Sequence, residues 1–197
     1  MKRALLVLVL ATCSLAGTAR ADGDPASDYL LGQKVFFPFD VKIPAAKQRE
    51  LTALVNAANH AGYHIRVALI ASSYDLGSIT SLWRKPRTYA RFLGAELQFV
   101  YKDRLLIVMP NGFGISRQGQ PVDREYRTLE TIPVRAGATG LVDAAEVAVR
   151  KLSKQAAVAV PATSDASHGH QSKALIVLAA VAAVAVLVLL RLALRRR

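Results

Sequence analysis

The feature that most constrains this chain is an apolar run close to its C-terminus. Uncharged residues extend without interruption from Ala174 to Leu190, and three more apolar residues follow Arg191. At 1.5 Å per residue, a helix of this run spans a hydrocarbon core of about 30 Å, and the Arg191 side chain reaches the interface by snorkelling. A buried helix of a soluble domain would carry polar residues on at least one face, and this run carries none. We therefore predict a transmembrane helix over residues 174–194.

The charges around the predicted span indicate its orientation. Residues 195–197 are all arginine, whereas only Lys173 directly precedes the span. Lys and Arg accumulate on the cytoplasmic side of membrane proteins. Residues 195–197 are therefore predicted to form a short cytoplasmic tail, with the N-terminal domain outside. The predicted location is the plasma membrane, which the chain crosses once.

The N-terminus agrees with export. Lys2 and Arg3 precede an apolar run that starts at Ala4, and residues 19–21 (Ala-Arg-Ala) match a small-x-small cleavage pattern. These features are typical of a secretory signal peptide, predicted here over residues 1–21. An uncleaved N-terminal anchor is the alternative, but the run is short for a membrane span.

Charge and cysteine usage limit the chemistry of the mature domain. Residues 22–172 contain 18 of the 26 Lys and Arg residues and all 14 Asp and Glu residues, so their net charge is +4 rather than the +12 of the whole chain. This mild balance does not indicate a nucleic-acid-binding protein. The single cysteine, Cys13, lies in the predicted signal peptide. A mature chain without cysteine has no disulfide, thiol nucleophile or Cys-based zinc site.

Residues 22–154 are predicted to form one α/β domain, a small sheet of mixed strands flanked by three helices. Apolar residues at helical spacing predict a helix that follows Pro44 and is closed by Gly62, and a second that begins at Pro86. A third is expected around Leu141 to Leu152.

The strands are predicted from runs of branched residues bounded by turn formers. YHIRVALIAS (63–72) and Arg104–Met109 are the expected core strands, and Gly112–Arg117 is expected to pair antiparallel with the latter. Asp28–Lys42 is expected to be mostly irregular, with a short extended piece at 34–37. Residues 155–173, rich in Ala, Ser, Thr, Gly and His, are predicted to form a flexible linker.

The second core strand is followed by Pro-Asn-Gly-Phe-Gly, a glycine-rich stretch that can be compared with known phosphate-binding loops. The stretch lacks the GxxxxGK[ST] pattern of a Walker loop, and Arg117 occupies the third glycine position of a dinucleotide fingerprint. One interpretation is a tight turn at the strand end. The other is a binding loop formed by Asn111, Gly112, Phe113 and Gly114.

The order of these segments resembles the TPM domain over residues 26–154. The resemblance is carried by HIRVALIAS, by Asp103 before an apolar strand, by Gly112-Phe113-Gly114 after it, and by GATGLVDAAEVAVRKL. Arg104 stands where the family has Asn of an Asp-Asn-Gly turn, and Ile115-Ser116 stand where it often has an acidic residue. The resemblance implies an α/β module of the thylakoid lumen or bacterial envelope. It also implies divalent-cation binding and the phosphatase activity reported for some members.

Two aspartates are the candidate ligands of a calcium or magnesium ion. Asp75 follows the first core strand and Asp103 precedes the second. Oxygen-ligated cations need several such groups together. If the two strands are parallel, however, these residues lie at opposite ends of the sheet, and the alternative is that each caps a turn or helix.

The most distinctive surface feature is a basic stripe. Arg84, Arg87 and Arg91 follow a spacing of three and four, which predicts one cationic helix face. Such a face is either simply solvated or a contact for anionic lipid headgroups or an acidic envelope partner. The sequence therefore favours a membrane-anchored, non-catalytic module that binds a partner or stabilises an envelope complex. A divalent-cation-dependent phosphatase of TPM type is the alternative.

Overall fold

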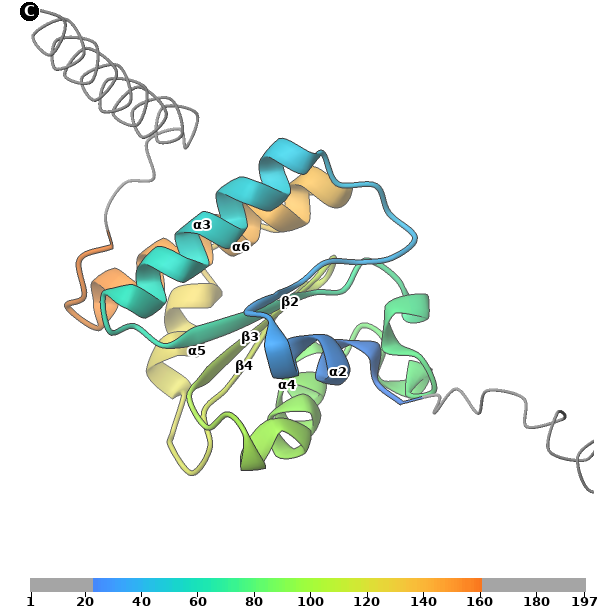
Figure 1. The fold of residues 1–197 in the computed structure, drawn as a ribbon, viewed down its shortest axis with the longest axis horizontal. Coiled ribbons are helices and arrows are strands. Elements are labelled where there is room, and N and C mark those ends of the chain that lie inside the picture. Colours follow the sequence, from blue (N-terminus) through green and yellow to red (C-terminus); the bar gives the residue numbers. More distant parts are fainter. Residues whose placement is uncertain (1–22, 161–197) are drawn as a thin grey trace, which may run out of the picture. The chain divides into compact units, whose positions relative to one another are not determined.

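A four-stranded sheet lies between layers of helices in the computed structural model, which describes residues 23–160 (Figure 1). The strands are β1 (Val35–Phe36), β2 (Ile65–Leu69), β3 (Arg104–Met109) and β4 (Gly112–Ser116), in that spatial order. β1, β2 and β3 are parallel, and β4 returns antiparallel to β3. The predicted α/β class and mixed sheet are confirmed.

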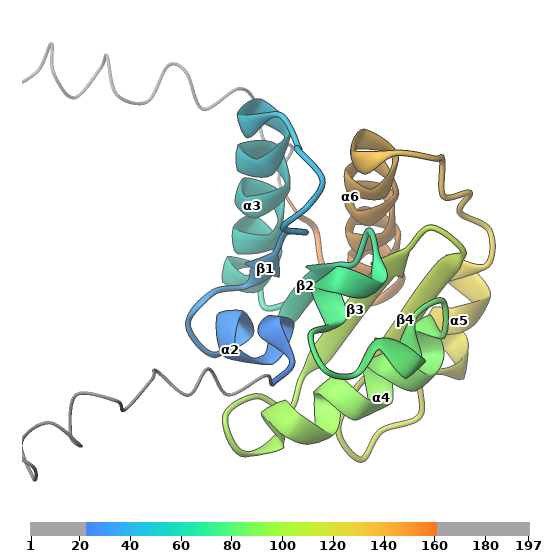
Figure 2. The ribbon, with the colours of Figure 1, turned by 90° about the vertical axis from the view of Figure 1, so that its right-hand side faces the viewer.

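The helices cover both faces of the sheet. They are α2 (Pro25–Gly32), α3 (Ala45–His60), α4 (Pro86–Glu96), α5 (Asp123–Leu129) and α6 (Ala138–Gln155), with short 3-10 turns η1 (Ser73–Leu76), η2 (Thr80–Leu82) and η3 (Leu97–Phe99). α3 and α6 lie side by side on one face, α2 and α4 lie on the other, and α5 flanks β4 (Figures 1 and 2). The predicted helices correspond to α3, α4 and α6.

Two helices are additional to the three that the sequence predicted. α2 occupies part of the segment expected to be irregular, and it begins with Asp24 as its N-cap and Pro25 in its first turn. α5 has only seven residues, of which Leu129 alone is buried. A helix this short and polar has little apolar periodicity, which is why the pattern did not indicate it.

Alternation along the central strands divides the apolar residues between two cores. One core includes Val67, Leu69, Leu106, Val108 and residues of α3 and α6. The other includes Ala68, Ile70, Leu105, Ile107 and residues of α2 and α4. Both faces of β2 and β3 are therefore covered, as expected of strands in a parallel arrangement.

A buried carboxyl group joins α2 to α4. The Asp24 side chain is 3% exposed; its Oδ1 accepts a hydrogen bond from the Ala26 N–H at 3.1 Å, and the Tyr89 hydroxyl donates to it at 2.8 Å. Burial raises the pKa of Asp24 to about 6. Ionisation of this group therefore opposes the packing of α2 against α4.

The predicted targeting segments fall outside the described residues. Between residues 23 and 160, no helix is both long and apolar enough to cross a membrane. The predicted signal peptide and the predicted span at 174–194 are not among the residues that the structure describes. α6 ends at Gln155, where the predicted linker begins, and Val158 and Val160 still pack against the first core.

Candidate binding site at the edge of strand β4

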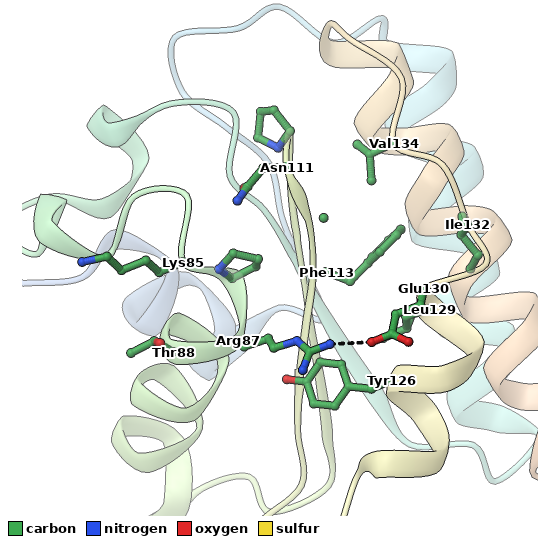
Figure 3. A pocket seen from close by; sticks show the side chains of 13 residues that line it. Lys85, Arg87, Thr88, Asn111, Phe113, Tyr126, Leu129, Glu130, Ile132 and Val134 are labelled. Carbon is green, nitrogen blue, oxygen red and sulfur yellow. Dashed lines mark hydrogen bonds and ion pairs between the residues drawn. The ribbon is translucent and has the colours of Figure 1, made fainter.

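A cavity of about 660 Å³ lies along the outer edge of β4 (Figure 3). One wall is the first turn of α4, and the other is the end of α5 with the segment that follows it. Three of the four residues of the predicted binding loop, Asn111, Gly112 and Phe113, line the cavity. The structure thus brings the loop to a concave surface together with Arg87 of the predicted basic stripe.

Gly114, the fourth residue of the predicted loop, allows α4 to lie directly on β4. A Cβ atom at this position would overlap the carbonyl oxygen of Pro86 and lie 2.9 Å from the Cβ of Ala90. Because contacts this short are not tolerated, only glycine permits the approach. Gly114 therefore positions the wall of the cavity rather than a ligand.

The other loop residues are held by a hydrogen bond to the segment before α4 and by packing in the first core. Asn111 Nδ2 donates a hydrogen bond to the Arg84 carbonyl at 2.7 Å. Arg84 has a φ of 58°, in the left-handed region that is uncommon for residues other than glycine. Phe113 is 8% exposed as a residue and belongs to the first core. The side chain of Phe113 is therefore part of the core and is not an exposed loop aromatic.

The main chain of Phe113 opens toward the cavity. Phe113 lies opposite Val108 in the antiparallel pair, and the Val108 carbonyl accepts from the N–H of Ile70, the residue directly after β2, at 2.9 Å. The main-chain groups of Val108 thus face β2, so Val108 and Phe113 form a non-hydrogen-bonded pair. The N–H and C=O of Phe113 consequently point out of the sheet edge.

Tyr126 of α5 closes the same edge two residues further along. The Ile115 N–H donates to the Tyr126 hydroxyl at 3.1 Å, and that hydroxyl donates to the Ile115 carbonyl at 3.0 Å. Both outward main-chain groups of Ile115 are therefore satisfied by one side chain. Phe113 has the same orientation, and within residues 23–160 no side chain hydrogen-bonds its N–H or C=O in this way.

Arg87 spans the edge from α4 to α5. Its Nη2 lies 2.6 Å from Glu130 Oε1, and its guanidinium lies 4.3 Å from the centre of the Tyr126 ring (Figure 3). The two side chains of the ion pair are 59% and 61% exposed, so the pair is weak and exchangeable. Lys85 and Thr88 extend away from the other lining side chains (Figure 3). Arg87 is thus the cation placed at the cavity.

The three arginines do not form the single stripe that their spacing predicted. Arg84 precedes α4, which begins at Pro86, so helical spacing does not apply to it. Arg87 and Arg91 do lie on α4 and together line a second cavity of about 560 Å³, to which Arg117 also contributes. Arg87 and Tyr126 line both cavities.

The two candidate metal ligands lie apart. β2 and β3 are parallel, so Asp75 and Asp103 lie at opposite ends of the sheet. The buried Asp75 accepts hydrogen bonds from three main-chain N–H groups, at Phe39, Ala71 and Ser72. Burial raises its pKa, with these hydrogen bonds opposing the shift. Within residues 23–160, no three His, Cys, Asp or Glu residues lie close enough together to hold a metal ion.

Sequence reasoning missed Tyr126 and Glu130, because α5 was not predicted. The signal that was present is the spacing of Tyr126 and Leu129 by three residues in an otherwise polar stretch. Such a pair is too short to distinguish a helix from a loop.

Comparisons with protein-family models, with curated proteins and with solved structures found no match. The resemblance to the TPM domain therefore stays a prediction. The geometry at the edge of β4 is the basis on which a function is proposed.

Proposed function

We propose that residues 23–160 form an extracytoplasmic binding domain, which the C-terminal apolar run holds at the outer face of the plasma membrane. In this proposal the cavity beside β4 binds an envelope partner, and no reaction is catalysed there. The topological part draws on the apolar runs and the arginine-rich C-terminus. The binding part draws on the described residues.

One observation carries the binding part: the outward N–H and C=O of Phe113 face a cavity large enough for several side chains. Polar main-chain groups at a sheet edge favour pairing with another chain. The cavity also has an apolar wall formed by Leu129, Ile132 and Val134, and Arg87 provides one charged group. Apolar walls with a few oriented polar groups are typical of binding sites.

Site-directed photo-crosslinking in native membranes tests this function. The full chain carries p-benzoylphenylalanine in place of Pro110, which is exposed at the rim of the cavity. The matched control carries it in place of Phe99, which is 89% exposed beyond the other end of α4. We expect one protein to crosslink from position 110 and not from position 99.

A second change links the crosslink to the cavity. Arg87→Glu alters only an exposed side chain, so the fold is retained, but it reverses the charge beside the site. The crosslink from position 110 is expected to weaken. No crosslink from position 110, or equal crosslinking from both positions, would remove the proposal.

A further inference from the structure

We infer that the cavity binds an extended peptide segment that pairs with Phe113 as an added strand, with acidic and apolar side chains alternating along it. This inference rests on the proposed function and specifies the chemistry of the partner. A short extended segment is enough, because the open part of the edge is bounded by the β3–β4 turn on one side and by Tyr126 on the other.

The requirement for an extended segment follows from the main chain. Phe113 offers one donor and one acceptor, both directed out of the sheet. A residue of an adjacent strand satisfies both groups at once, because its own N–H and C=O lie on the same side. The Tyr126 hydroxyl already hydrogen-bonds both the N–H and the C=O of Ile115 within the chain.

The requirement for alternation follows from the two walls. Successive side chains of a strand point to opposite faces of the sheet. On one face the added strand meets the apolar wall of Leu129, Ile132 and Val134, and on the other it meets α4 with Arg87 (Figure 3). A carboxylate of the peptide replaces or joins Glu130 on Arg87, whose present ion pair is exposed and weak.

Two other occupants fit less well. A phosphate of a lipid headgroup accepts hydrogen bonds but has no donor for the Phe113 carbonyl, and it makes no use of the apolar wall. A second copy of this chain would have to bring its own β4 edge close, and α5 lies alongside that edge in each copy. The peptide is the occupant that engages the Phe113 main chain, the apolar wall and Arg87 together.

Fluorescence anisotropy with the full chain in detergent micelles tests the inference. The probe is a labelled octapeptide of alternating glutamate and valine. It is compared with a peptide of the same composition in which the glutamates and valines form two blocks. A third peptide has the alternating sequence with only the valine amides N-methylated. The residue opposite Phe113 carries its side chain on the face of the apolar wall and is therefore a valine, so this change removes the donors of the pairing edge and keeps every side chain. We expect saturable binding of the first peptide and at least about tenfold weaker binding of the other two.

Variants of exposed arginines separate the charge from the fold. Arg87→Gln is expected to weaken binding of the glutamate–valine peptide by about tenfold. Binding of an alternating glutamine–valine peptide should be unchanged. Arg91→Gln is the matched control, because Arg91 lies one turn further along α4 and does not line this cavity. It is expected to bind the glutamate peptide like the unsubstituted chain.

Each contrary outcome has a defined meaning. Equal binding of the N-methylated peptide would overturn strand addition. Arg87-dependent binding of phosphatidylglycerol vesicles without peptide binding would assign the site to lipid headgroups, and self-association that Tyr126→Phe strengthens and that excludes the peptide would assign it to a second copy. A specific crosslink from position 110 combined with no peptide binding would remove this inference and leave the binding domain in place.

Discussion

We expect the substitution Asp24→Asn to stabilise the folded domain at neutral pH and to leave its stability below pH 4 nearly unchanged. Burial raises the pKa of Asp24 from 3.8 to about 6, although hydrogen bonds from Tyr89 and Ala26 partly oppose this. The folded chain therefore binds more protons than the unfolded chain between these values. The stabilising contribution of the neutral carboxyl is complete below pH 3.8 and is lost as the pH rises through 6.

The size of the effect follows from the difference in pKa. One pKa unit corresponds to about 1.4 kcal/mol, so the free energy of unfolding should fall by about 3 kcal/mol across this range because of Asp24. Asparagine stays neutral at every pH. Its amide can accept from the Ala26 N–H and donate to the Tyr89 hydroxyl, so both contacts of the carboxyl are retained.

Urea unfolding of residues 22–160 between pH 3.5 and 8, followed by the fluorescence of the single tryptophan, Trp83, measures this. Trp83 packs against the same core as Tyr89. Asp28→Asn, which changes an exposed carboxyl on the same helix, is the matched control. If the difference between Asp24→Asn and the unsubstituted chain varies by less than about 0.5 kcal/mol across this pH range, the proposed cost of ionising Asp24 is wrong.

Three further predictions concern the site and its neighbours. Gly114→Ala should lower the free energy of unfolding by about 3 kcal/mol or more, because its Cβ meets the backbone of α4. Gly94→Ala meets only the side chain of Ser116, whose hydroxyl can rotate away, and should be neutral or stabilising; equal stabilities of the two variants in urea would contradict the close approach. Tyr126→Phe should destabilise by about 1–2 kcal/mol and speed hydrogen exchange of the Ile115 amide, because the hydroxyl bonds both of its main-chain groups; unchanged exchange would show that this hydroxyl does not protect the edge. Asp75→Asn should lower the free energy of unfolding by about 2–3 kcal/mol, since an amide NH₂ would face main-chain N–H donors. Millimolar Ca²⁺ or Mg²⁺ should leave the melting temperature of the unsubstituted chain unchanged. A melting temperature that rises with Ca²⁺ or Mg²⁺ and no longer does so in Asp75→Asn would instead support the metal site.

The sheet and the three long helices were predictable because their apolar patterns are long. Residues Arg104–Met109 form β3 within the expected limits, and α4 begins at the proline that indicated it. The strands at the centre of a sheet are buried on both faces, which leaves a continuous apolar run in the sequence. α2 depends instead on Asp24 and its distant partner Tyr89, 65 residues away, and no local pattern reveals such a pair.

The candidate site was predictable only in part. Asn111, Gly112, Phe113 and Arg87 were identified from the sequence, and all four line the cavity. Arg87 lies close to the loop because Gly114 allows β4 to pack directly against α4. This contact between distant segments has no sequence signature. Glu130 and Tyr126 complete the site from α5, which is too short for its periodicity to be informative.

The two edges of the sheet are protected in different ways, and the difference bears on function. An edge strand exposes unpaired main-chain groups, and proteins limit this by short strands, covering elements or charges. β1 has only two residues, so little of its edge is available. β4 has five, and its edge is flanked by α5, whose Tyr126 hydroxyl bonds Ile115, and by the exposed ion pair of Arg87 with Glu130. Phe113 lies between the β3–β4 turn and these covering groups. A partner strand can therefore hydrogen-bond to both the N–H and the C=O of Phe113 without displacing a buried side chain.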